Sequence, residues 1–508
     1  MDILSAHAAA HPDKVALVCG GDVLTYAALE ERACRVANVF ADLGVRAGDR
    51  VATISFNSIA SFEVSSGLRK LGAVGVPVNF RLRGEELAYI LNDSGAKVVC
   101  AGPELVGEVE AIRPLLTGNP ALLSLAGAAA PDGWLSLDAC ARAASPLAPA
   151  PPDEAATGAT MIYTSGTTGH PKGAYRPQGL PLEQVLQTIE LFTLRADDVH
   201  LMAGPGYHSA VGFFASLTLV CGATIVIMPR FEPETALQLI ERHRVTTTFM
   251  APILLQRLVD LPPEVQDRYD VSSMRVIVVA AAPCPFSLKQ RIQELFGEVL
   301  WEFYGATETG INTVLRPEEQ LRKPGSVGRV APGHEILLLD DEGRPVPDGQ
   351  PGEVWVKNAW LATYHNRPDA TARAMRDGYL SVGDVAYRDA EGYYYICDRK
   401  VDMIISGGVN IYPAEIESCL AGHPAVADVA VIGVPDQQWG EAVKALVVRR
   451  PSAEATEAEL IDWCRRRIAD YKRPRSVDFV PELPRDQAGK LLKRQIRERY
   501  WAGSGRWL

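Results

Sequence analysis

The chain has 508 residues, 47% of them hydrophobic, and a formal net charge of -11. This length allows large buried cores, and a prior of roughly 150 residues per domain suggests two to four folded units. The negative charge gives no reason to expect a nucleic acid or an anionic membrane surface as a partner, so phosphate groups would have to meet local basic clusters.

The N-terminal part of the chain alternates between strand and helix patterns. We expect strands over residues 15–18 and 50–55, and helices over residues 26–43 and 59–70. Such alternation is typical of α/β proteins, in which helices cover mostly parallel sheets. Residues 126–157 are rich in Ala and Pro, and we expect them to form a surface connection between two subdomains.

An apolar run at residues 159–163 leads directly into the segment TSGTTGHPKGA at residues 164–174. A strand followed by a loop with four hydroxyls, three glycines and one lysine can close backbone N–H groups on an oxyanion, and ATP is the expected cargo. The P-loop pattern GxxxxGK[ST] does not fit, because Gly173 follows Lys172. A solvated turn would explain the composition, but not why Pro171 and Lys172 follow the second glycine.

The pattern changes in the last third of the chain. Short strands interrupted by glycine are expected at residues 336–339, 352–356 and 393–396, which is typical of a small β-rich unit. Beyond about residue 401 we expect the order helix, strand, strand, helix, strand, with examples at residues 413–420, 426–434 and 444–449.

Nine cysteines are scattered without a CxxC pair or a metal-ligand spacing, which predicts reduced, buried, small apolar side chains. The first residues carry no basic segment followed by a long apolar run, and no stretch of about eighteen uninterrupted apolar residues occurs later. We therefore expect a cytoplasmic protein without an integral membrane segment.

Several motifs, in the same order along the chain, resemble those of the adenylate-forming superfamily, which contains acyl-CoA synthetases, luciferases and the adenylation domains of peptide synthetases. They are TSGTTGHPKG at residues 164–173, YGATE at 304–308, GD at 383–384, DRKVDMIISGGVNIYPAEIE at 398–417, YKRP at 471–474 and PRDQAGKLLKR at 484–494. The match covers nearly the whole chain and is closest to bacterial fatty acyl-CoA synthetases.

The resemblance implies two domains. Residues 1–398 would form a large N-terminal domain of helix-flanked, mostly parallel sheets plus a small β-rich subdomain, and residues 399–508 a small, mobile α+β C-terminal domain. Within the N-terminal domain, subdomains are expected at about residues 1–157, 158–330 and 331–398.

It also implies an ATP-dependent acid-thiol ligase. A carboxylate would attack the α-phosphate of ATP to form an acyl-adenylate, and the thiol of CoA would then displace AMP. The implied cofactors are ATP/AMP, Mg²⁺ and CoA, and the partner is a hydrophobic carboxylic acid or its acyl-adenylate, with no nucleic acid; a homodimer is compatible with it.

The site residues carried over from the family fall into functional groups. For catalysis, Lys490 would reach the reacting carboxylate and the α-phosphate, with Thr307 beside that phosphate, Glu308 as the Mg²⁺ ligand and His208 next to the acyl pocket. The nucleotide would be bound by Thr164, Ser165, Gly166, Thr167, Thr168, Gly169, Lys172, Ala282, Tyr304, Gly305, Asp384 and Arg399.

Small or apolar residues would line the acyl pocket: Tyr207, Ala210, Val211, Gly212, Phe213, Ala281 and Ala306. For the second step the C-terminal domain would rotate, so that the loop of Ser406, Gly407 and Gly408 shapes a tunnel for the pantetheine arm of CoA. Lys444, Lys472 and Arg473 are candidates for the CoA phosphates. The alternatives are a solvated Lys490, a structural His208 and an ordinary Gly-Gly hairpin.

Four positions depart from the family pattern. Val382 replaces a threonine near the nucleotide, and Ala280 replaces a glycine, so that one extra methyl would crowd adenine and substrate; Val401 and Gly206 are also unusual. These changes leave open a ligase that only converts a preformed acyl-adenylate into a thioester. A stand-alone adenylation enzyme that loads a carrier protein and a luciferase-like oxygenase share the same motifs, and intact Lys490 and Glu308 argue against a nucleotide sensor without activity.

Overall fold

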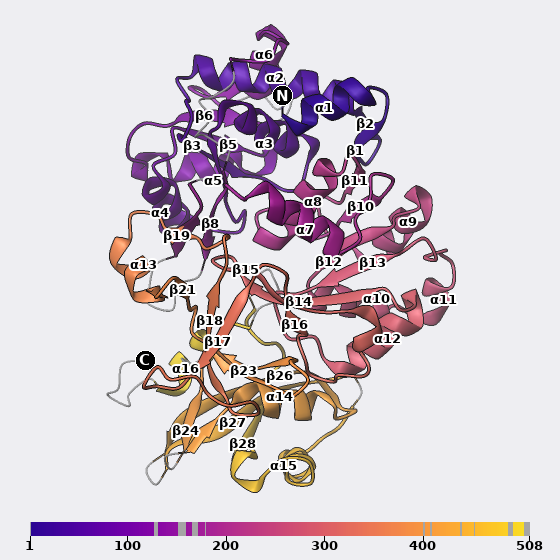
Figure 1. The fold of residues 1–508 in the computed structure, drawn as a ribbon, viewed down its shortest axis with the longest axis vertical. Coiled ribbons are helices and arrows are strands. Elements are labelled where there is room, and N and C mark those ends of the chain that lie inside the picture. Colours follow the sequence, from indigo (N-terminus) through magenta and orange to yellow (C-terminus); the bar gives the residue numbers. More distant parts are fainter. Residues whose placement is uncertain are drawn as a thin grey trace.

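The structure is a computed structural model that describes residues 2–125, 131–150, 159–164, 171–177, 179–399, 402–406, 409–436, 439–451, 453–485 and 491–501. The chain adopts an α/β fold, as predicted. Figure 1 shows the N-terminal sheets at the top, the β14 and β15 region in the centre and the C-terminal sheet at the bottom.

The largest sheet has nine strands in the order β16-β15-β14-β13-β12-β10-β11-β1-β2. The strands from β14 to β1 pair in parallel, whereas β2, β15 and β16 add antiparallel edges. The strand bounds are β1 Val15–Cys19, β2 Asp22–Thr25, β10 Val199–Met202, β11 Thr224–Ile227, β12 Thr247–Met250, β13 Val276–Val279, β14 Leu300–Ala306, β15 Gly310–Leu315 and β16 Arg329–Val330. The first two strands of the chain therefore belong to a sheet whose other strands follow residue 198.

A second, fully parallel sheet has the order β4-β3-β5-β6-β7. Its strands are β3 Arg50–Ile54, β4 Val74–Pro77, β5 Val98–Ala101, β6 Ala121–Ser124 and β7 Leu135–Ser136. The expected surface connection at residues 126–157 is wrong in part, because β7 joins this sheet and the helix α6 (Leu137–Ala143) follows it. Trp134 and Leu137 are buried there, which the Ala- and Pro-rich composition concealed.

Three smaller sheets complete the fold. The first joins β8 (Met161–Thr164), β9 (Lys172–Tyr175) and β19 (Thr363–Tyr364). The second is the β-rich unit, with β17 Glu335–Leu339, β18 Gly352–Lys357, β20 Met375–Arg376, β21 Tyr379–Leu380, β22 Asp384–Arg388 and β23 Tyr394–Arg399. The C-terminal sheet contains β24 Ile404–Ser406, β25 Val409–Ile411, β26 Val426–Asp436, β27 Gly440–Arg449 and β28 Ser476–Phe479.

Some helices begin at residues whose side chains cap them. The Thr25 side chain accepts a hydrogen bond from the backbone of Ala28 at the start of α2, and Ser58 with Ser61 forms a capping box at α3. The helices are α1 Ile3–Ala10, α2 Tyr26–Asp42, α3 Ile59–Leu71, α4 Gly84–Ser94, α5 Val106–Ala111, α7 Leu182–Leu191, α8 Ser209–Val220, α9 Pro233–His243, α10 Pro252–Val259, α11 Pro263–Gln266, α12 Phe286–Phe296, α13 Pro368–Ala374, α14 Pro413–Ala421, α15 Glu457–Arg465 and α16 Lys493–Trp501.

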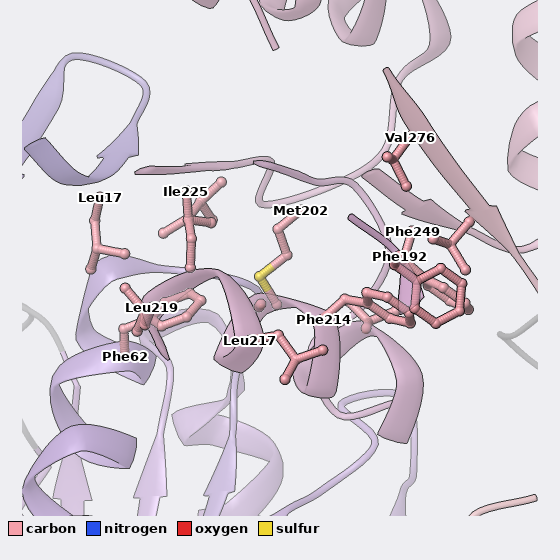
Figure 2. Close-up of a cluster of buried hydrophobic side chains, with 14 of the residues drawn as sticks. Leu17, Phe62, Phe192, Met202, Phe214, Leu217, Leu219, Ile225, Phe249 and Val276 are labelled. Atoms are coloured by element: carbon pink, nitrogen blue, oxygen red, sulfur yellow. The ribbon is translucent and has the colours of Figure 1, made fainter. Parts of the chain in front are cut away.

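The core that supports the site lies between α8 and the largest sheet. Figure 2 shows Phe192, Phe214 and Phe249 at one end of this cluster and Met202 near its middle. The rings of Phe214 and Phe249 stack with centroids 5.6 Å apart. Burial of this many aromatic rings fixes α8 on the sheet, since each contributes a large apolar area.

The cysteines are free thiols, as expected, but only Cys34, Cys100 and Cys464 are buried and the other six are half-buried. None of the described helices combines the length and the apolar character that crossing a membrane requires.

A buried ion pair joins α12 to the largest sheet. The Lys289 ammonium contacts the Glu302 carboxylate, and the two side chains are 1% and 6% exposed. Burial raises the pKa of Glu302, and Lys289 opposes that rise. Both charged groups are removed from water, so each needs the other to compensate its lost hydration.

Replacing Lys289 by Met should therefore lower the free energy of unfolding by about 3–5 kcal/mol, because the carboxylate stays buried without its partner. A carboxyl group whose pKa is raised in the folded state stabilises the fold at low pH, and this contribution is lost as the pH rises through the raised pKa. The loss for Lys289→Met should thus grow as the pH rises above 4.5, the ordinary pKa of a Glu carboxyl group. Urea unfolding followed by circular dichroism measures it. Lys289→Met/Glu302→Met should recover most of the loss, and a double variant as unstable as the single one would contradict this account.

Candidate active site

Three segments that are distant in sequence meet around the Glu308 carboxylate. Glu308 follows β14 and is 7% exposed. Its Oε1 accepts hydrogen bonds from the Thr164 hydroxyl at 3.0 Å and from the Tyr364 hydroxyl at 3.1 Å. Because β9 pairs with both β8 and β19, Thr164 and Tyr364 are held on the same small sheet. The predicted phosphate strand and the predicted metal ligand are therefore neighbours.

Lys172 lies on β9 opposite Thr164, and its Nζ is 5.1 Å from the centre of the Tyr364 ring. The predicted lysine of the phosphate loop thus lies beside the same cluster. The other predicted loop residues, Ser165, Gly166, Thr167, Thr168 and Gly169, lie outside the described residues.

The oxygen atoms at this cluster fit Mg²⁺. Mg²⁺ prefers oxygen ligands and is usually bound by one or two carboxylates together with substrate phosphates. Glu308 supplies one carboxylate, and the described part of the chain holds no group of three or more His, Cys, Asp or Glu residues that could form a metal cage. A metal here would accordingly depend on phosphate oxygens as well as on Glu308.

A second contact joins two of the predicted nucleotide-binding residues. The Tyr304 hydroxyl on β14 donates to Asp384 Oδ2 at 2.7 Å, and Asp384 is 7% exposed at the start of β22. Asp384 is the register partner of Arg399 on β23, whose side chain is outside the described residues. The strands thus bring two of the predicted nucleotide-binding positions together.

The backbone around position 305 shows why that residue is glycine, and the turn that contains Val382 keeps a hydroxyl group. A Cβ on Gly305 would lie 1.9 Å from the Gly310 carbonyl oxygen, so the β14–β15 hairpin requires glycine. Val382 was expected to remove a hydroxyl, but the Ser381 hydroxyl one residue earlier accepts a hydrogen bond from the backbone of Gly383 at 3.1 Å. A hydroxyl therefore remains in this turn.

The first turn of α8 carries the predicted acyl-pocket residues. His208 precedes the helix as its N-cap residue, and its ring lies 4.4 Å from that of Tyr207. The hydroxyls of Ser209 and Thr307 are 3.1 Å apart, which joins this helix to the residue beside Glu308. Half-buried Ala210, Gly212 and Phe213 lie on α8, and half-buried Ala306 ends β14. Val211, also expected there, is buried in the hydrophobic core.

The structure changes the interpretation of Ala280. Ala280 is buried in the hydrophobic core at the end of β13, so the expected crowding of the nucleotide by its methyl group finds no support. The unusual backbone lies one residue later, where Ala281 has φ 75°. A residue with a side chain pays roughly 1 kcal/mol for this conformation. Ala282, which follows, is half-buried.

Asn57 is a supporting residue that the sequence analysis missed. Its amide donates to the carbonyls of Gly204 and Met228 and accepts from the backbone of Gly206 at 2.8 Å. A Cβ on Gly206 would lie 2.6 Å from Met202 Cε and 3.2 Å from the Asn57 oxygen. The glycine at this unusual position thus lets Asn57 hold the loop that presents Tyr207 and His208.

Arg176 is the second missed residue. Its Nη2 donates to the Thr307 carbonyl at 2.6 Å and its Nε donates to the Trp360 carbonyl. Burial lowers the pKa of Arg176 to about 10, and the charge of Glu308 opposes this shift, so the guanidinium stays protonated at neutral pH. Arg176 ties the end of β9 to the Thr307–Glu308 segment and to the segment before β19.

The predicted CoA residues are separate from this cluster. Ser406 ends β24, where it pairs with Gly440, and Gly407 and Gly408 lie outside the described residues. Each predicted basic residue is held by a carboxylate at 2.7 Å: Lys444 by Asp478, Lys472 by Glu415 and Arg473 by Asp470. A role in binding CoA phosphates would require these pairs to open. Lys490 is also outside the described residues, so its role stays a prediction.

If Arg176 positions Thr307 and Glu308, Arg176→Met should lower the rate of ATP-pyrophosphate exchange about a hundredfold, the scale expected for a small misplacement of reacting groups. Arg176→Lys keeps the charge but cannot reach both carbonyls, so it should rescue only part of the rate. Exchange kinetics at saturating ATP measure this. Full rescue by lysine would show that charge, and not the bridge, is what matters.

Comparisons with known proteins identify the family. The family model for AMP-binding enzymes matches residues 4–364, and that for the C-terminal domain of AMP-binding enzymes matches residues 415–490. The chain is 38% identical to a feruloyl-CoA synthase of an Amycolatopsis species, over 96% of both proteins. It is 36% identical to the long-chain-fatty-acid–CoA ligase FadD13 of Mycobacterium tuberculosis, over 94% of this chain and 93% of the relative. The crystal structure of ATP-bound MatB from Rhodopseudomonas palustris matches with a TM-score of 0.87 and 32% identity, covering 98% of both chains. The chain belongs to the AMP-binding enzyme family, within the adenylate-forming superfamily, as an ATP-dependent, AMP-forming acyl-CoA synthetase.

Proposed function

We propose that this enzyme activates a hydrophobic carboxylic acid as its acyl-adenylate and transfers the acyl group to CoA. The observation that carries the proposal is the chain of contacts from Thr164 through Glu308 to Thr307 and Ser209. It joins the predicted phosphate strand, the predicted metal ligand and the first turn of the predicted acyl-pocket helix by direct side-chain contacts. Nucleotide and acid could therefore react without leaving that cluster.

The acid is proposed to be hydrophobic because the described pocket residues are small or apolar. Ala210, Phe213 and Ala306 offer no charge. The nearby cation, Arg176, already uses Nε and Nη2 to bind two carbonyls of the main chain. The named activities of the relatives, on ferulate and on long-chain fatty acids, support an acid with a large apolar part.

Each group would contribute a separate part of the first step. A metal bound at Glu308 would neutralise phosphate charge, and Lys172 would add a cation at the same end of the nucleotide. Lys490 would stabilise the carboxylate and α-phosphate oxygens as they approach, and Tyr304 with Asp384 would hold the nucleoside. Thioester formation would then use the loop at Ser406, Gly407 and Gly408 after the C-terminal domain has rotated.

A ligase restricted to the second step is the weaker candidate. It rested on Ala280 crowding the nucleotide and on the hydroxyl missing at Val382. Ala280 packs in the core, and Ser381 provides a hydroxyl in the same turn, so neither position supports a defective first step.

The test of the proposed function is direct detection of products. The purified enzyme is incubated with ATP, Mg²⁺, CoA and a library of hydrophobic acids, and CoA thioesters are identified by mass spectrometry. Thioesters that require ATP, together with release of AMP and pyrophosphate, are expected. Formation of adenylate without any thioester would instead favour a carrier protein as the acceptor.

Lys490→Ala should slow adenylate formation from acid and ATP about a hundredfold or more, because an electrostatic contact to the developing charge is lost. Thioester formation from a synthetic acyl-adenylate should change only a few-fold, since Lys490 has left the site in that step. Single-turnover rates of the two half-reactions measure the difference. The control is Arg494→Ala, which removes an exposed charge of the same tail that pairs with Glu498. Equal loss of both half-reactions in Lys490→Ala would contradict the division of labour.

A further inference from the structure

A hydrogen-bonded cluster on α4 connects this helix to the predicted phosphate loop. Tyr89 and Asp93 are four residues apart on α4, so they lie on the same face of the helix. The Tyr89 hydroxyl donates to the Pro171 carbonyl at 3.1 Å. The Tyr163 hydroxyl donates to Asp93 Oδ2 at 2.8 Å. Tyr163 is on β8 and Pro171 directly precedes β9, so α4 contacts both sides of the loop (Figure 1).

Arg367, in the turn before α13, completes the cluster. Its Nη2 donates to Asp93 Oδ1 at 2.8 Å and to the Tyr89 hydroxyl oxygen at 3.1 Å. A guanidinium can only donate, so the Tyr89 oxygen accepts this bond and its own hydrogen is left for the Pro171 carbonyl. The direction of every hydrogen bond from Arg367 to the loop is therefore determined.

Burial strengthens the dependence of these groups on one another. The Asp93 side chain is 10% exposed, and a carboxylate removed from water needs hydrogen-bond donors to compensate its lost hydration. Burial and the hydrogen bond to Asp93 raise the pKa of Tyr163, which keeps its hydroxyl protonated as a donor. Tyr89 and Tyr163 also pack against the hydrophobic core beside the parallel sheet. The two tyrosines thus connect the loop to a packed interior.

The contacted residues are the immediate neighbours of two predicted phosphate-binding side chains. Thr164 follows Tyr163, and its hydroxyl donates to the Glu308 carboxylate at 3.0 Å. Lys172 follows Pro171 and is the register partner of Thr164 on the next strand. Displacing Tyr163 or Pro171 would therefore move a hydroxyl or a cation of the predicted triphosphate site.

Arg367 is also linked to the Glu308 carboxylate through the backbone. Its N–H donates to the Tyr364 carbonyl at 3.2 Å, and the Tyr364 hydroxyl donates to Glu308 at 3.1 Å. One turn thus presents Arg367 to the cluster on α4 and Tyr364 to the predicted metal ligand.

We propose that Tyr89, Asp93 and Arg367 are positioning residues for the β- and γ-phosphates of ATP, because they fix Thr164 and Lys172 at the two ends of the phosphate loop. This inference rests on the proposed function and adds residues to the same site. AMP and an acyl-adenylate lack these two phosphates, so the three residues should matter for binding of ATP and not for binding of AMP. A cluster that only stabilises the fold would not distinguish the two nucleotides.

The test measures binding of ATP with Mg²⁺ and of AMP by calorimetry, without acid or CoA. Tyr89→Phe keeps the ring and loses the bond to Pro171, so it should raise the dissociation constant of ATP about three- to tenfold, as expected for one hydrogen bond, and leave that of AMP unchanged. Arg367→Met, which removes donors from Asp93 and Tyr89, should raise it at least as much. The matched control is Tyr379→Phe, which loses a hydroxyl that donates to Glu335 at 2.7 Å in the β-rich unit, and it should change neither constant.

The two half-reactions provide a second measurement. In ATP-pyrophosphate exchange, Tyr89→Phe should raise KM for ATP by about the same factor with little change in kcat, since the lost contact serves binding in the ground state and the transition state alike. Thioester formation from a synthetic acyl-adenylate and CoA should keep the wild-type rate, because no triphosphate takes part in that step.

Equal weakening of ATP and AMP binding in Tyr89→Phe would overturn the inference. Unchanged ATP binding together with a lower unfolding temperature would also overturn it, since the cluster would then only stabilise the fold. If the wild-type enzyme binds both nucleotides but forms no thioester from any acid, the proposed function fails, and the comparison of ATP with AMP still decides the inference.

Discussion

The pairing of β9 with two partners is the constraint on which the site depends. β9 is antiparallel to β8 on one side and to β19 on the other, although nearly two hundred residues separate β9 from β19. Only this pairing brings Thr164 and Tyr364 to the Glu308 carboxylate. The carboxylate needs such partners, because a buried charge is costly unless hydrogen bonds compensate it. The small sheet thus supplies the hydrogen bonds that the buried Glu308 carboxylate requires.

The same cluster also brings positive charges together. The chain carries a net charge of -11, yet a polyphosphate must be bound at one point. Lys172 and Arg176 stand at the two ends of β9 and place two cations within this small region. Arg176 is further constrained by two main-chain carbonyls, so its charge is fixed in position without being free to bind substrate. The position of these two cations matters more for phosphate binding than the net charge of the chain, because nearby charges dominate the electric field in a partly buried site.

Local patterns predicted much of the fold. The helix expected at residues 26–43 is α2, Tyr26–Asp42, and the strand expected at residues 50–55 is β3, Arg50–Ile54, because apolar periodicity and capping residues mark both. The pairing of β1 with β11 was not predictable, since no pattern within five residues specifies a partner two hundred residues away. β7 and α6 were missed because Ala and Pro in residues 126–157 suggested a linker, whereas a few buried residues such as Trp134 suffice to attach them to the sheet.

The same distinction applies to the site. Glu308, Thr164, Tyr304 and Asp384 were predicted because they stand in motifs, and the structure brings them together in pairs. Arg176 and Asn57 act on backbone carbonyls, which every residue has, so no sequence pattern marks their partners.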